Sequence, residues 1–131
     1  MEEFLLEFDK NEPTSLSVIN DFEKQATKIL PTDYANFMIT ANGGEGSVGS
    51  SYLILWKIED INKLNQAYDV EEFASGLLII GSDGGDTAYC INYRKEDIFF
   101  VKVPFIGMSI DMVEVCGESF NDFLRYLYEL E

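Results

Sequence analysis

The sequence predicts an α+β domain in which a mostly antiparallel sheet carries helices from both ends of the chain. Three observations lead to this prediction. Apolar residues recur at helical spacing near the start, short β-branched and aromatic runs alternate with glycine turns in the middle, and helical spacing returns at the end. A length of 131 residues suits a single domain over residues 1–131, which would bury roughly two-thirds of the surface of the unfolded chain.

Residues 2–8 fit a short helix or a strand equally well, but two helices are predicted in the rest of the first third of the chain. Five apolar residues at spacings of three and four predict an amphipathic helix that ends before Pro31. They are Leu16, Ile19, Phe22, Ala26 and Ile29. A second helix is expected to begin at Thr32, whose hydroxyl would cap it, with Asp33 in its positive first turn. Its buried stripe is expected to be Tyr34, Phe37, Met38 and Ala41.

The middle of the chain is expected to form strands joined by turns. The glycines within residues 42–49 predict the end of the second helix and a flexible loop. A helix is predicted over residues 59–68, and strands are predicted over residues 51–56, 77–80, 87–93 and 98–103, with an edge strand over 112–116. A last helix is expected to be capped by Ser119. Its apolar side is expected to be Phe120, Phe123, Leu124, Leu127 and Tyr128.

The acidity of the chain restricts the class of partner. The formal charge is −15, from 24 acidic and 9 basic residues, and such a field would repel nucleic acid and anionic membranes while attracting a basic protein. The alternative interpretation is that the acidity only keeps the protein in solution. No stretch approaches the roughly 20 apolar residues that a membrane-spanning helix needs.

Cys90 and Cys116 lie inside apolar runs, and the first residues lack the basic start and apolar stretch of a secretory signal. We therefore expect reduced thiols in a cytoplasmic protein. The partner is expected to be another protein, and the chain itself is expected to be a monomer or a weak homodimer.

Little in the sequence indicates catalysis. There is no histidine, which removes the commonest general base and metal ligand. Asp83 and Asp86 could meet a hard cation or act as an acid and base pair, but their spacing is unspecific and a tight turn between strands is the favoured interpretation. Gly43, Gly44, Gly46 and Gly49 follow a helix instead of leading into one, which argues against a phosphate-binding loop. No catalytic, metal-binding or cofactor-binding residue is predicted.

Three blocks of sequence resemble the SUKH superfamily. Its Leu-Pro-x-x-Tyr-x-x-Phe helix and Asn-Gly-Gly turn match Leu30, Pro31, Tyr34, Phe37, Asn42, Gly43 and Gly44. Its second signature, a strand ending in a glycine and aspartate turn, matches Gly81, Asp83, Gly84 and Tyr89. A terminal Ser-Phe-x-x-Phe-Leu segment matches Ser119, Phe120, Phe123 and Leu124. Residues 1–17 lie outside the clear resemblance.

The resemblance implies a compact α+β scaffold and, for bacterial members, an immunity protein that binds and silences a toxin, often a nuclease. Fungal members resemble regulators of cell-wall synthesis, so a regulatory scaffold for an endogenous partner is the alternative. An enzyme that uses Asp83 and Asp86 is a third hypothesis. The motif residues are expected to be architectural, and partner contacts are expected on the surface. The candidates for partner contacts are Glu45, Trp56, Asp83, Asp86, Glu96 and Asp97.

Overall fold

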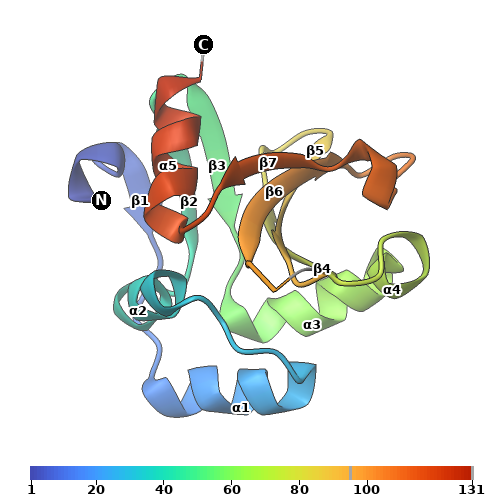
Figure 1. Cartoon of the computed structure of the whole chain (residues 1–131). Helices are drawn as coiled ribbons and strands as arrows, with labels where there is room; N and C mark the ends of the chain where they lie inside the picture. The colour runs from blue at the N-terminus through green and yellow to red at the C-terminus, as the bar shows by residue number, and fades with distance from the viewer. Residues whose placement is uncertain (95, 131) are drawn as a thin grey trace.

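The computed structural model describes residues 1–94 and 96–130 of the chain. These residues form one seven-stranded sheet whose strand order follows the chain order, and every neighbouring pair is antiparallel. Helices from both halves of the chain pack against this curved sheet (Figure 1). The predicted single α+β domain is confirmed.

The helices and strands lie close to the predicted ranges, with two additional strands near the start. The strands are β1 (Phe8–Lys10), β2 (Gly44–Val48), β3 (Ser51–Leu55), β4 (Leu77–Ser82), β5 (Thr87–Asn92), β6 (Phe99–Pro104) and β7 (Glu114–Gly117). The α-helices are α1 (Leu16–Ala26), α2 (Thr32–Thr40), α3 (Ile58–Ala67), α4 (Val70–Phe73) and α5 (Phe120–Glu129). Two short 3₁₀ helices are η1 (Glu2–Phe4) and η2 (Ile110–Met112).

The sheet buries both of its faces in the region of β4, β5 and β6. Successive side chains of a strand point to opposite faces, so Leu78 and Ile80 join the larger core while Leu77 and Ile79 join a smaller one. This double burial explains the uninterrupted apolar run of β4. The larger core lies beneath α1, α2 and α5, and the smaller core is covered by α4 and by Met108 after β6.

Aromatic rings fill the centre of the larger core. The rings of Tyr34 and Phe120 lie 5.4 Å apart between centroids, and those of Phe100 and Phe123 lie 5.6 Å apart. Such pairs add about 0.5–1.5 kcal/mol beyond the burial of their area. Most of the apolar motif residues lie in this core. They are Leu30, Tyr34, Phe37, Tyr89, Phe120 and Phe123.

The start of α2 differs from the prediction. Pro31 occupies the capping position and no side chain caps this helix, so the predicted cap by Thr32 is wrong. Asp33 instead reaches α5, where its two carboxylate oxygens accept hydrogen bonds from the backbone N–H groups of Phe120 (3.2 Å) and Asn121 (3.0 Å). A carboxylate is favoured there because the first N–H groups of a helix have no partner within it. The predicted cap of α5 by Ser119 is confirmed by the 3.0 Å hydrogen bond from the Asp122 N–H to its hydroxyl.

Asn42, at the other end of α2, performs the same task for α3. Its side-chain oxygen accepts a 2.9 Å hydrogen bond from the N–H of Ile58, and its side-chain nitrogen donates a 2.7 Å hydrogen bond to Glu59. Lys57, the residue before α3, provides no side-chain cap. Asn42 is buried, so this distant amide supplies the partner that the helix end needs.

The predicted flexible loop over residues 42–49 is wrong, because residues 44–48 form β2 between β1 and β3. Gly44 and Gly46 have positive φ angles of 149° and 156°. The backbone of β1 lies so close that a Cβ at Gly44 would collide with the carbonyl oxygen of Asp9. The glycines therefore permit close strand pairing, although glycine usually weakens a strand.

The predicted buried stripe of the first helix is wrong at both ends. Leu16 and Ile29 are 60% and 71% exposed, while Ile19 and Phe22 are buried. Thr27 adopts a left-handed conformation with φ of 55° and ends α1 at Ala26, so Ile29 lies outside the helix. Tyr128 in α5 is also more exposed than expected at 47%, and its ring packs on that of Phe4 at 5.2 Å.

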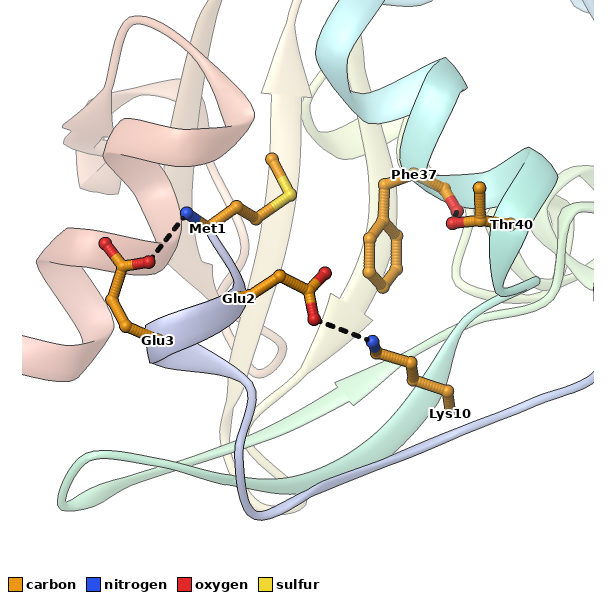
Figure 2. Close-up of polar contacts among 6 residues, drawn as sticks. All are labelled: Met1, Glu2, Glu3, Lys10, Phe37 and Thr40. Carbon is orange, nitrogen blue, oxygen red and sulfur yellow. Dashed lines mark hydrogen bonds and ion pairs between the residues drawn. The ribbon is translucent and has the colours of Figure 1, made fainter.

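The open question of residues 2–8 is resolved as a 3₁₀ helix followed by the first residue of β1. Figure 2 shows Lys10 paired with Glu2 at 3.4 Å and the terminal amine of Met1 paired with Glu3 at 3.0 Å. Exposed ion pairs of this kind contribute little to stability. The burial of Phe4, Leu5 and Phe8 in the larger core therefore holds this segment in place.

Figure 2 also shows how the end of α2 is completed. The hydroxyl of Thr40 donates a 2.8 Å hydrogen bond to the carbonyl oxygen of Phe37, one of the last carbonyls of the helix.

Nowhere in residues 1–94 and 96–130 is a helix long and apolar enough to span a membrane.

Removal of the Asp33 carboxylate should destabilise the fold. We expect Asp33→Ala to lower the free energy of unfolding by about 1–3 kcal/mol, because the start of α5 loses two hydrogen bonds to a charged group. Asp21→Ala, at an exposed position of α1, should change it by less than about 0.5 kcal/mol. Urea unfolding monitored by circular dichroism measures both. Equal stability of the two variants would contradict the capping role.

The two thiols should be unreactive in the folded protein. Cys90 and Cys116 are both buried, and burial raises the pKa of Cys116 to about 12 and that of Cys90 also above its usual value. Because the thiolate is the reactive form, Ellman's reagent at pH 8 should label neither thiol in the native state and both in urea. Rapid labelling of the native protein would contradict this burial.

Candidate protein-binding surface

The second face of the sheet is left open at β3. Leu53 and Leu55 point into the larger core and are 0% and 2% exposed, whereas Tyr52 on the other face is 42% exposed. Ile54 and Trp56 follow Tyr52 at alternate positions on this face and are half-buried. The run of residues 51–56 therefore has apolar side chains on both faces of the strand, which is why its pattern does not indicate which face is buried.

A shallow hollow of about 460 Å³ lies beside this row of side chains. Its walls come from β3, the end of α3, the turn between β4 and β5, and the residues after β6. The lining includes Ile54, Trp56, Tyr68, Asp86, Phe105 and Ile106. Ile106 is 85% exposed, so an apolar side chain stands at the rim of the hollow.

Three aromatic rings form a continuous row along the hollow. The ring of Trp56 is nearly parallel to that of Tyr68, with an interplanar angle of 9° and 6.3 Å between centroids. Tyr68 in turn packs against Phe105 at 4.8 Å. Trp56 also contacts both cores. The row is therefore ordered by packing, while Tyr68 remains 44% exposed.

The turn between β4 and β5 forms one wall of the hollow and is held by its own side chains. One oxygen of Asp83 accepts hydrogen bonds from the N–H groups of Gly85 (2.8 Å) and Thr87 (3.1 Å), and the hydroxyl of Ser82 accepts one from Gly84 (3.1 Å). Gly84 has a φ of 84°, a conformation that favours glycine. The favoured interpretation of this segment as a tight turn is therefore confirmed in its geometry.

Acidic side chains continue this face onto β1 and β2. Glu45 lies opposite both Asp9 and Ile54 in the strand register, and directly opposed side chains share a face of the sheet. The carboxylate of Glu45 accepts a 2.5 Å hydrogen bond from the hydroxyl of Tyr52, and this bond raises the pKa of Tyr52. Like charges opposed in this way destabilise a sheet, so the Asp9 and Glu45 pair concentrates negative charge at a cost in stability.

Comparison with known families matches residues 13–126 to the SMI1 / KNR4 family (SUKH-1). The chain belongs to this family. The SUKH-1 match contains α1 to α5 except for the last residues of α5, and β1 lies before its start. No curated protein matches the sequence.

The SUKH-1 scaffold brings together four of the six predicted contact residues. Glu45, Trp56, Asp83 and Asp86 lie on or beside the open face around the hollow. Glu96 and Asp97 lie in the turn between β5 and β6, which is at the opposite end of β5 from the turn that contains Asp86. The two groups therefore belong to separate surfaces of the molecule.

Several residues of this surface were not predicted from the sequence. Tyr68 was placed at the end of the helix predicted over residues 59–68, and Phe105 and Ile106 lay beyond the strand predicted over residues 98–103. The spacing of Tyr52, Ile54 and Trp56 at alternate positions was the available signal, because it predicts a shared face of one strand. Among the described residues, no group of three or more acidic or cysteine side chains is placed to hold a metal ion.

Gly81 and Gly85 provide a matched test of the packing behind this surface. A Cβ at Gly81 would collide with the carbonyl oxygen of Ile54, whereas one at Gly85 would meet only the Asp83 carboxylate, at 3.6 Å. We expect Gly81→Ala to lower the free energy of unfolding by about 2–3 kcal/mol and Gly85→Ala to change it by less than about 0.5 kcal/mol. Urea unfolding curves measure both, and a stable Gly81→Ala protein would contradict the close pairing of β3 and β4.

Proposed function

We propose that this protein is a non-enzymatic immunity protein that binds a toxin in the cytoplasm and neutralises it by covering its active or substrate-binding surface. The open aromatic and acidic face beside β3 carries this proposal. Membership of the SUKH-1 family supports it, because the resemblance of the motifs implies toxin-neutralising proteins among the bacterial members.

The chemistry of the open face suits contact with another protein. Aromatic side chains that are ordered before binding are typical anchors of protein interfaces. Tyr52, Tyr68 and Ile106 are all more than 40% exposed, and an exposed apolar patch with a polar rim is a common mark of such a site.

The charge of the chain suits a toxin with a cationic cleft, such as a nuclease. A formal charge of −15 would speed capture of a basic surface and would compete there with a polyanionic substrate. The acidic pair of Asp9 and Glu45 lies on the same face as Ile54. Attraction to a basic partner would offset the repulsion within this pair.

A role in binding without turnover completes the proposal. The sequence contains no histidine, and one oxygen of Asp83 is already engaged by two backbone N–H groups of its turn. This engagement favours a structural role for Asp83 over a role in acid and base catalysis. A regulatory scaffold for an endogenous partner would use the same kind of face, so rescue from a toxin separates the two functions.

The test is co-expression of the chain with the candidate toxin encoded beside its gene. We expect survival of the host and a complex that can be purified, whose affinity falls as salt is raised because the charges are screened. Absence of both rescue and binding would reject the proposal. Binding without rescue would favour the regulatory scaffold.

Two exposed isoleucines test where the toxin binds. Ile106→Ala should weaken toxin binding by roughly 5- to 30-fold, as expected when an interface anchor is truncated. Ile29→Ala, which is similarly exposed at 71% but lies in the loop after α1, should leave the affinity within about twofold. Isothermal titration calorimetry measures both affinities. Equal effects of the two substitutions would place the contact elsewhere.

A further inference from the structure

We infer that the hollow beside β3 receives an arginine side chain of the partner, stacked on the row of Trp56, Tyr68 and Phe105 and paired with the carboxylate of Asp86. This inference rests on the proposed function, because it assigns the chemistry of the partner group at the same surface. The occupant is therefore a guanidinium group on a protein loop. The supporting observations are the row of partly exposed rings, the available carboxylate and the positions of the chain's own cations.

The aromatic row provides stacking surface in an ordered form. Trp56 and Tyr68 are nearly parallel at 9°, and Phe105 packs against Tyr68 with 4.8 Å between centroids. Tyr68 is 44% exposed, so part of this row is open to a ligand. A planar cation that stacks here is attracted by the negative ring face without a large loss of side-chain freedom in the host protein.

Asp86 places a negative charge at the same hollow. Its backbone carbonyl oxygen accepts a 2.8 Å hydrogen bond from the N–H of Phe105, which ties the acidic residue to the aromatic row. The side chain of Asp86 is exposed and accepts no hydrogen bond from any other described residue. Asp83 differs, because one of its oxygens is used within the turn. Asp86 is therefore the carboxylate available to a ligand.

The chain places its own cations over other rings. Lys28 lies 5.8 Å from the ring centroid of Tyr93, and Lys102 lies 5.3 Å from that of Tyr126. Within the described residues no lysine or arginine lies over Trp56, Tyr68 or Phe105, and none lines the hollow. The hollow therefore combines aromatic rings and a carboxylate without a lysine or arginine of the same chain among the described residues, and such a surface is complementary to a cation from a partner.

The combination of rings and a carboxylate favours arginine over lysine. The guanidinium group is planar, is weakly hydrated, stacks on aromatic faces and matches a carboxylate with two parallel hydrogen bonds. The lysine ammonium is a compact, strongly hydrated point charge. Stacking on the aromatic side of the hollow displaces water from the cation, so the more weakly hydrated guanidinium is expected to bind better.

The test uses the single tryptophan as a reporter, since the chain contains one Trp and it lies in the hollow. The probes are the capped tripeptide Gly-Arg-Gly and its Gly-Lys-Gly counterpart, titrated at constant ionic strength. The readout is the indole N–H resonance of Trp56 together with its fluorescence. We expect a saturable shift with the arginine probe and an affinity about fivefold weaker for the lysine probe.

Two charge variants distinguish a direct ion pair with Asp86 from attraction to the overall negative charge of the protein. Asp86→Asn should weaken binding of the arginine probe by about fivefold, and Asp21→Asn on α1 should leave it unchanged although both remove one negative charge. Tyr68→Leu keeps an apolar side chain but removes a ring, and it should also weaken the arginine probe more than the lysine probe. Unchanged thermal unfolding would show that each variant is folded.

Three results would overturn the inference. They are equal affinities for the two probes, an Asp86→Asn protein that binds like the wild type, and a Trp56 signal that changes with protein concentration alone, which would assign the face to a second copy of the chain. A toxin that binds the protein while these probes fail would reject the arginine slot and leave the proposed function standing. A selective response to the arginine probe with no toxin binding or rescue would support the arginine site and reject the proposed function.

Discussion

Two polar side chains, one at each end of α2, bind the first turns of two other helices. Asp33 at one end of α2 binds the first N–H groups of α5, and Asn42 just beyond the other end binds the first N–H group of α3. A helix end that lacks such partners is costly to bury. The 3₁₀ turns and strands contribute area to the core, while these two side chains, together with the Ser119 cap of α5, supply partners for the first N–H groups of α3 and α5. The sequence motif that contains α2 therefore links this helix to both α3 and α5.

The position of α3 has a direct effect on the open face. Asn42 binds the first turn of this helix. The helix ends at Ala67, just before Tyr68, whose ring stacks beside that of Trp56. Asn65, one turn earlier, bonds both the N–H and the carbonyl oxygen of Ile79 in β4. These bonds satisfy strand groups that β3 does not reach, since β3 pairs with β4 only at Ser82 and Gly81. On the outer face of β3, beside this short pairing, Tyr52 remains 42% exposed.

Local patterns in the sequence predicted those elements whose causes are local. The apolar run of residues 77–80 and the Ser119 cap needed only neighbouring residues for their interpretation. Asp33 was correctly placed in the first turn of its helix, but its contact with α5 was not predicted because its partners, Phe120 and Asn121, lie 87 and 88 residues away. β2 was not predicted because its glycines were interpreted as a flexible loop. They are needed for close pairing with β1, and the spacing of residues along the chain does not reveal that pairing. Likewise, Trp56 was predicted as a contact residue by itself. The aromatic row that it forms was not predicted, because Tyr68 and Phe105 come from distant segments of the chain.

The strand order has a consequence for assembly at the ribosome. The short connections between β2 and β3 and between β4 and β5 allow these pairs to form early, and such local contacts favour rapid folding. In contrast, α1 and α2 separate β1 from β2, and α3 and α4 separate β3 from β4. α5 follows all seven strands, and the rings of Phe120 and Phe123 complete the aromatic centre. Tyr34 packs against Phe120, and Phe100 packs against both Phe120 and Phe123. Burial of the apolar interior of the sheet is therefore complete only when α5, the element furthest along the chain from α2, has packed against it.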